Sequence, residues 1–203
     1  MPEPDDRVRK AYVEPTNACN LDCKTCVRHS WDEPEGFMEW ATFESVVDGL
    51  AQATAGEPGT AAFMGLGEPL LHPRFLDMVR AVKQRGLRAE VTTNALLLDE
   101  AMAAGLLEAG LDQLVVSIDG ASAEAFGRVR SGASLARLVE NMRRLNDARG
   151  SNYGPSMRIG VEFVAMRSNI DELPGLGRLA ARVGARTAKA MKTDHRWLGD
   201  ANA

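Results

Sequence analysis

The feature that most constrains the fold is a regular alternation of short apolar runs with longer amphipathic segments along the chain. In five segments, apolar side chains recur at the i, i+3, i+4 and i+7 spacing of one helix face. These segments begin near residues 43, 75, 99, 135 and 173. Five strand-like runs lie at residues 10–13, 60–64, 88–92, 113–118 and 158–166. Because a helix is the usual connection between parallel strands, this order predicts an α/β fold with parallel pairing.

Two closures of such a sheet are compatible with the alternation: an open doubly wound sheet and a partial (β/α) barrel of about five to six units. A dinucleotide-binding doubly wound sheet would carry a Gly-x-Gly-x-x-Gly turn after its first strand. Here the first strand is followed by Glu14-Pro-Thr-Asn-Ala-Cys19 instead. Most polar motifs also follow directly after a strand, where α/β barrels place their chemistry. The sequence therefore predicts a partial barrel of parallel strands.

Composition excludes several classes of protein. The net charge is −4 and basic residues form no long run, so nucleic acid is not an expected partner. No apolar stretch approaches the roughly 18 residues of a membrane span, so no membrane partner is expected. The acidic, polar start is unlike a signal peptide, and we therefore expect a cytoplasmic protein.

The three cysteines of the chain, Cys19, Cys23 and Cys26, lie within eight residues in a C-x3-C-x2-C spacing. An odd, clustered set in a chain without an export signal argues against disulfides and favours a metal or catalytic site. A cubane iron–sulfur cluster has four irons, so three thiolates leave one iron free to bind a cofactor. Two alternatives remain: a zinc site completed by His29, and buried, inert cysteines.

The segment from Glu14 to Arg28, which contains these cysteines, resembles the amino-terminal motif of the radical S-adenosylmethionine (SAM) superfamily. Many members of that family carry an aromatic residue where this chain has Thr25. The resemblance implies that Cys19, Cys23 and Cys26 hold a [4Fe–4S] cluster. It also implies that reduced ferredoxin or flavodoxin supplies an electron, and that SAM is cleaved to methionine and a 5′-deoxyadenosyl radical.

Further motifs follow in the order of the family and imply a SAM site. Gly67-Glu68-Pro69 resembles the family's Gly-Gly-Glu-Pro turn, which binds the methionyl ammonium, with Leu66 in place of the first glycine. Asn94 belongs to a segment similar to Thr-Asn-Gly, with Ala95 in place of the glycine. Read alone, each of these segments also fits an ordinary turn between a strand and a helix.

Two later motifs imply contacts to the rest of SAM. Ser117-Ile-Asp119-Gly is similar to the family's Ser-x-Asp-Gly, whose serine or aspartate faces the ribose. Arg130 lies in a segment like the family's Ile-Arg-Gly and is the implied partner of the methionyl carboxylate. The resemblance implies no catalytic residue beyond the cluster ligands. Glu162 interrupts an apolar strand and could face the site or solvent.

The substrate is indicated only by the loop after the cysteines. Residues 26–38 resemble the loop of radical enzymes encoded with tungsten-dependent aldehyde ferredoxin oxidoreductases. This implies maturation of a cofactor, with an aldehyde oxidoreductase or its cofactor as partner. The alternatives are a peptide-modifying radical maturase, a zinc-binding module and an inactive, truncated remnant.

The carboxyl end departs from the family pattern. Both kinds of radical relative continue with further cysteines, whereas none follows Cys26 in this chain. Residues 187–190 include two alanines and a lysine, which are poor strand formers. We therefore expect a radical SAM core over residues 1–186 and an atypical polar tail over 187–203, in which His195 is solvated. The barrel would end, as if truncated, at its fifth strand, leaving an exposed edge.

Overall fold

The computed structural model describes residues 8–30, 32–54, 57–150 and 157–192. Its main sheet contains β1 (Lys10–Val13), β3 (Thr60–Phe63), β4 (Arg88–Thr93), β5 (Gln113–Ser117), β7 (Arg158–Ala165) and β8 (Thr187–Lys192). The strands lie in the order β1-β3-β4-β5-β7-β8, and every neighbouring pair is parallel. The predicted α/β partial barrel of parallel strands is confirmed.

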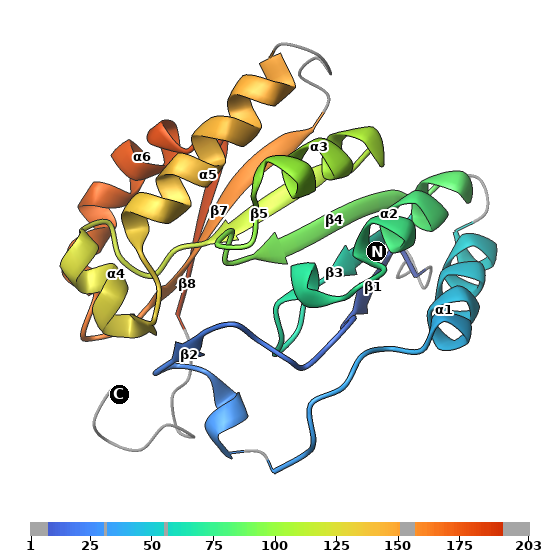
Figure 1. Cartoon of the computed structure of the whole chain (residues 1–203), viewed down its shortest axis with the longest axis horizontal. Coiled ribbons are helices and arrows are strands. Elements are labelled where there is room, and N and C mark those ends of the chain that lie inside the picture. The colour runs from blue at the N-terminus through green and yellow to red at the C-terminus, as the bar shows by residue number, and fades with distance from the viewer. Residues whose placement is uncertain (1–7, 31, 55–56, 151–156, 193–203) are drawn as a thin grey trace, which may run out of the picture.

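Helices connect the strands and follow one another along the outside of the curved sheet (Figure 1). They are α1 (Trp40–Ala53), α2 (Phe75–Gln84), α3 (Glu100–Glu108), α4 (Ala123–Val129), α5 (Leu135–Ala148) and α6 (Leu173–Arg182). The described residues also form the 3₁₀ turns η1 (Val27–Ser30), η2 (Pro69–Leu71) and η4 (Ile170–Glu172). None of the described helices is long and apolar enough to cross a membrane.

The alternation of burial along the strands separates the two faces of the sheet. In β4, Ala89, Val91 and Thr93 are buried, whereas Glu90 and Thr92 are only partly covered. The buried face packs against the apolar stripes of the helices, with Phe43, Phe63, Phe75, Met78, Leu106, Leu138 and Met142 fully enclosed. The apolar faces of the helices therefore bury one side of the sheet, whereas the concave side stays partly open and carries both polar and apolar side chains.

The sheet has a sixth strand where the sequence analysis expected the barrel to end. Residues 187–192 form β8, which pairs with β7 over six residues, from Gly160 opposite Thr187 to Ala165 opposite Lys192. The prediction that the barrel ends at the fifth strand was wrong because pairing with the exposed edge of β7 outweighs the weak intrinsic propensity of alanine and lysine. His195 and residues 193–203 of the expected tail lie outside the described residues, as does Trp31 in the loop after the cysteines.

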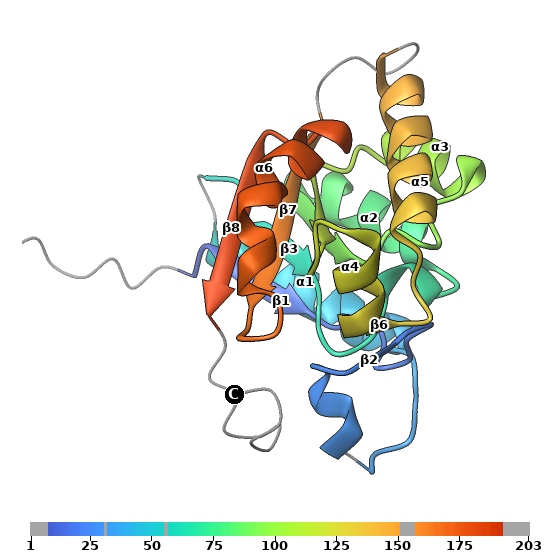
Figure 2. The ribbon, with the colours of Figure 1, turned by 90° about the vertical axis from the view of Figure 1, so that its left-hand side faces the viewer.

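A small second ladder fastens the cysteine segment to the barrel. β2 (Asp22–Cys23) pairs antiparallel with β6 (Arg130–Ser131), so that Cys23 lies opposite Arg130. The backbone N–H of Lys24 also donates to the carbonyl of Val129 at 2.9 Å. Figure 2 shows this ladder beneath α4, the helix that leads from the end of β5 into β6.

The turn between β5 and α4 requires close approach of two backbone segments. A Cβ atom on Gly120 would lie 2.3 Å from the backbone nitrogen of Phe126, in the first turns of α4. The carboxylate of Glu172 holds the same turn, accepting hydrogen bonds from the N–H groups of Ala121 and Ser122 at 2.8 and 2.6 Å. Glycine at position 120 therefore sets how closely α4 can approach the end of β5.

Replacing Gly120 with alanine should lower the free energy of unfolding by about 1–3 kcal/mol, since the clash is with backbone and not with a movable side chain. Gly127→Ala, within the same helix, is the matched control, because a Cβ there meets nothing within 4 Å. The control should raise stability by up to about 1 kcal/mol through helix propensity. Urea denaturation of both variants measures the difference, and equal stabilities would contradict this account of the turn.

Candidate functional site

The three cysteines lie on the loop between β1 and α1, which crosses the carboxyl end of the sheet; we call it the cysteine loop. The loop is fastened by its own polar side chains. The Thr16 hydroxyl donates to the carbonyl of Gly36 at 2.6 Å and accepts from the N–H of Ala18 at 3.0 Å. The Asn17 side chain donates to the carbonyl of Pro34 and accepts from the N–H of Gly36. The segment after the cysteines is thus folded back onto the segment before them.

A cavity of about 230 Å³ opens beside the cysteines at the carboxyl ends of β3, β4 and β5; we call it the cysteine cavity. Its lining includes most of the residues predicted from sequence: Cys19, Cys23, Cys26, Gly67, Glu68, Asn94, Ser117 and Arg130. Pro69 and Asp119 do not line it. The structure therefore brings together residues that lie more than 100 positions apart in the sequence, while their individual roles stay predictions.

Glu68 is 2% exposed, and its carboxylate is satisfied by the protein. One oxygen accepts from the Thr93 hydroxyl at 2.7 Å and from the N–H of Leu70 at 3.2 Å. The other accepts from the N–H of Asn94 at 2.8 Å. Burial raises the pKa of Glu68, although these hydrogen bonds act in the opposite direction. Glu68 therefore joins the end of β3 to the end of β4 at the edge of the cavity.

Gly67 and Pro69, on either side of Glu68, shape the turn that brings Glu68 close to the cysteine loop. A Cβ atom on Gly67 would lie 2.1 Å from the carbonyl oxygen of Thr16, so only glycine lets the turn reach the cysteine loop. The N–H of Glu68 donates to the carbonyl of Ala18 at 2.8 Å. Pro69 begins η2, where the missing N–H of proline costs no hydrogen bond. Pro69 thus shapes the turn and does not face the cavity.

Asp119 lies behind Arg130 and not in the cavity wall. One carboxylate oxygen is 2.7 Å from the Arg130 guanidinium, and the other accepts from the N–H of Val164 at 2.9 Å. Asp119 is 1% exposed, so the structure does not bring its carboxylate to the space where the resemblance implied a ribose. Ser117, the other member of that motif, does line the cavity.

The cysteine thiols lie in a largely desolvated setting. Burial raises the pKa of the Cys19 thiol, and it raises the pKa of the Cys23 thiol to about 11. The nearby Arg130 guanidinium acts against burial at Cys23 and favours the thiolate. Since thiolates are the metal-binding form, binding of a metal must displace protons from these two residues.

His29, the fourth ligand of the zinc alternative, has another role in this structure. Its Nε2 lies 2.9 Å from the carbonyl oxygen of Cys23 and 3.4 Å from a carboxylate oxygen of Asp22. Within the described ranges, no three His, Cys, Asp or Glu side chains are grouped as ligands of a single metal ion. The hydrogen bond of His29 supports a part in holding the loop.

A second cavity, of about 660 Å³, runs along the concave face of the barrel; we call it the inner cavity. It shares Met64, Gly65, Thr92 and Glu162 with the cysteine cavity, so the two spaces adjoin. The structure thereby answers the open question about Glu162, which faces the site. Glu162 is 3.5 Å from the ammonium group of Lys189 on β8. Sequence reasoning did not select Lys189, because β8 was not expected.

The inner cavity also contains a second ion pair that sequence analysis missed. The Lys10 ammonium group donates to both carboxylate oxygens of Glu90 at 3.0 Å. The two residues lie two strands apart in the sheet, on β1 and β4, and nothing in their local sequence indicates the pairing. The alternation of polar and apolar residues in β4 is the signal that could have placed Glu90 on the inner face.

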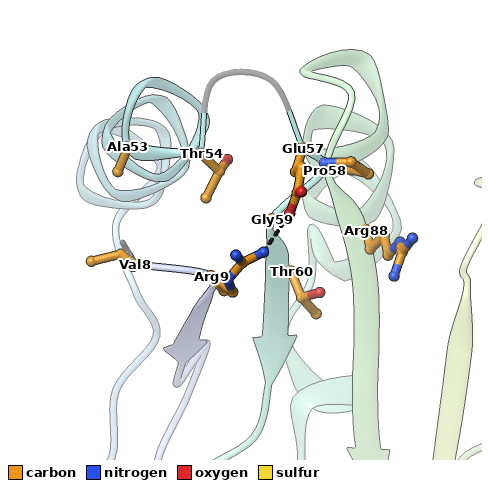
Figure 3. A pocket seen from close by; sticks show the side chains of 9 residues that line it. All are labelled: Val8, Arg9, Ala53, Thr54, Glu57, Pro58, Gly59, Thr60 and Arg88. Carbon is orange, nitrogen blue, oxygen red and sulfur yellow. Dashed lines mark hydrogen bonds and ion pairs between the residues drawn. The ribbon is translucent and has the colours of Figure 1, made fainter. Parts of the chain in front are cut away.

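A third cavity, of about 370 Å³, lies at the opposite, amino-terminal end of the strands (Figure 3). Arg9 and Glu57 form an ion pair across it, and Thr60 and Arg88 line it at the starts of β3 and β4. It contains none of the predicted site residues. The predicted site residues that line a cavity therefore lie together at the carboxyl ends of the strands, as expected for an α/β barrel.

Comparison with known proteins relates the chain to one superfamily. The family model described as the radical SAM superfamily matches residues 13–170. A tungsten-containing aldehyde ferredoxin oxidoreductase cofactor-modifying protein from Pyrococcus furiosus is 34% identical over 177 residues, covering 85% of this chain and 48% of that protein. The mycofactocin maturase MftC of Mycobacterium ulcerans is 27% identical over 172 residues, covering 85% of this chain and 44% of that protein.

Among solved structures, SuiB of Streptococcus suis bound to S-adenosylmethionine superimposes with a TM-score of 0.73. The match covers 91% of this chain and 40% of SuiB at 14% identity, which shows a shared fold. The chain spans about half the length of the curated relatives that it matches.

The raised pKa of Cys23 predicts how its reactivity depends on pH, because the thiolate is the nucleophile. In the metal-free protein, alkylation of Cys23 by iodoacetamide should rise about tenfold per pH unit between pH 7 and 9, since a pKa of about 11 lies above that range. Mass spectrometry of the Cys23 peptide measures the rate, with free cysteine as the reference. An alkylation rate that reaches half of its maximum near pH 8.5 would indicate an ordinary thiol and contradict the desolvated setting.

Proposed function

The chain belongs to the radical SAM superfamily, and from this premise we propose that it is the catalytic core of an enzyme that cleaves S-adenosylmethionine reductively. The observation that carries the proposal is the cysteine cavity, which places three free thiols beside Glu68, Asn94, Ser117 and Arg130. When bound, a reduced [4Fe–4S] cluster supplies the electron that breaks the sulfonium–carbon bond, giving methionine and a 5′-deoxyadenosyl radical. The residues of the chain bind, orient and shield the reactants.

The cysteine loop fits a cluster held by three thiolates. Cys19, Cys23 and Cys26 are free and only partly exposed. Cys23 is fixed by the β2–β6 ladder, and the N–H of Cys26 donates to the carbonyl of Cys23 at 2.9 Å. Burial disfavours the thiolates of Cys19 and Cys23, so positively charged iron would stabilise the form that burial penalises at these two residues.

The wall of the cysteine cavity fits the methionyl part of SAM, with its amino and carboxylate groups. Arg130 carries a buried Nε–H that has no hydrogen-bond partner among the described residues. A buried donor without an acceptor is costly, and a carboxylate in the cavity would supply the acceptor. We assign the methionyl carboxylate to Arg130 on this ground, and the methionyl ammonium to the turn of Gly67 and Glu68. Asn94 and Ser117 supply polar contacts on the sides of the cavity formed by β4 and β5.

The inner cavity is the proposed place of the substrate. Because it adjoins the cysteine cavity at Met64, Gly65, Thr92 and Glu162, a molecule in it would lie next to bound SAM. By analogy with the Pyrococcus furiosus relative, we propose that the enzyme matures the cofactor of a tungsten-dependent aldehyde oxidoreductase. The electron would come from reduced ferredoxin or flavodoxin, and free thiols fit a reducing, cytoplasmic setting.

Anaerobic reconstitution with iron and sulfide tests the cluster. The wild-type chain should bind about four irons and four sulfides, and replacing Cys19, Cys23 and Cys26 with alanine should abolish this binding. On reduction with dithionite, the reconstituted protein should convert SAM to 5′-deoxyadenosine, measured by liquid chromatography.

The matched control replaces His29 with alanine, which removes the ligand that a zinc site would need. The control should keep its iron and sulfide. Binding of one zinc in preference to iron, with loss of that zinc on replacement of His29, would overturn the proposal in favour of a zinc module.

A further inference from the structure

One ion pair at the edge of the cysteine cavity is almost completely enclosed. The Arg130 guanidinium lies 2.7 Å from Asp119, and their side chains are 11% and 2% exposed. The other ion pairs of the described residues are markedly more exposed on at least one side. A buried pair of this kind adds little net stability, because the cost of removing two charges from water offsets their attraction. Its presence beside the cavity therefore calls for a role other than stability.

Asp119 is held in place from several directions. Its free carboxylate oxygen accepts from the N–H of Val164 on β7 at 2.9 Å. Its backbone carbonyl accepts from the side-chain amide of Asn169 at 3.0 Å, and Asn169 is itself 1% exposed. Asp119 follows β5, and Val164 lies on β7, so the carboxylate and the backbone of Asp119 together join the ends of two neighbouring strands.

The position of the Arg130 guanidinium, in turn, depends on Asp119. Arg130 is the C-cap residue of α4, where its backbone N–H donates to the carbonyl of Phe126. Among the described residues, its guanidinium forms an ion pair with Asp119. The guanidinium lines the cysteine cavity and is close enough to Cys23 to influence its pKa. Asp119 thus determines where this positive charge lies relative to the cavity.

We propose that Asp119 is a positioning residue that acts through Arg130: it orients the guanidinium for the carboxylate of SAM and does not contact SAM itself. The inference rests on the proposed function, in which Arg130 binds that carboxylate. A fixed guanidinium loses less side-chain freedom when its ligand arrives, which favours binding. The Arg130 guanidinium would then lie between two carboxylates, that of Asp119 and that of SAM.

The test compares two ligands on the reconstituted protein. SAM carries the methionyl carboxylate, whereas 5′-methylthioadenosine has the same adenosine and lacks the amino acid group. Asp119→Asn should weaken SAM binding about tenfold or more, the scale of one lost hydrogen bond to a charged group. It should leave the affinity for 5′-methylthioadenosine unchanged, and calorimetry measures both. Equal weakening of the two ligands would place Asp119 at the adenosine and overturn the proposal.

Asp112 offers a matched control. One of its carboxylate oxygens accepts from the Lys83 ammonium at 2.6 Å and from the N–H of Ala89 at 2.8 Å, at the amino-terminal end of the sheet. It therefore combines a cation and a backbone donor, as Asp119 does, but far from the cysteines. Asp112→Asn should bind both ligands like the wild type. Loss of SAM affinity in this control would show that the effect of Asp119 is a general loss of structure.

A double variant distinguishes the inference from the proposed function. If Asp119 acts through Arg130, the variant with both Asp119→Asn and Arg130→Gln should bind SAM as weakly as Arg130→Gln alone, and it contains no unpaired buried charge that could prevent folding. Independent, multiplying losses would overturn the inference. If Arg130→Gln weakens SAM selectively and Asp119→Asn does not, the inference fails while the proposed function stands. If Arg130→Gln weakens neither ligand, the proposed carboxylate site itself is wrong.

Discussion

The site depends on one buried carboxylate. Glu68 must have hydrogen-bond donors around it, because an ionised group without them could not remain inside the protein. Those donors come from Thr93, Asn94 and Leu70, and the N–H of Glu68 in turn binds the cysteine loop at Ala18. A single residue thereby links β3, β4 and the loop. This link is one of two anchors that hold the cysteine loop over the end of the sheet.

The second anchor of the cysteine loop lies on the other side of the cavity. The β2–β6 ladder pairs Cys23 with Arg130, and the side chain of Arg130 is held by Asp119. The two anchors come from different parts of the barrel, β3 and β4 on one side and β5 and α4 on the other. The cavity between them is therefore bounded by polar groups with fixed positions, and its open side faces the inner cavity through Glu162.

The sequence predicted the parallel barrel and most of the cavity wall, because both follow from local patterns: helical periodicity, and short motifs at strand ends. It failed where the outcome depends on distant partners. The segment from Thr187 to Lys192 has weak strand propensity and forms β8 only because β7 offers an edge. The contacts of Asp119 with Arg130 and Val164 likewise could not be read from its motif, and its predicted role at the cofactor stays a prediction. Lys10 and Glu90 meet only because β1, β3 and β4 are neighbours in the sheet.

The account is tested most directly by asking whether the amino acid group of SAM lies beside a cluster held by the three cysteines. Electron–nuclear double resonance on the reduced, reconstituted protein with SAM labelled with nitrogen-15 at the amino group provides this measurement. The account predicts a nitrogen coupling to the cluster that is absent when unlabelled 5′-methylthioadenosine replaces SAM. A cluster signal that shows no coupling to the labelled nitrogen, under conditions where SAM is bound, would contradict it.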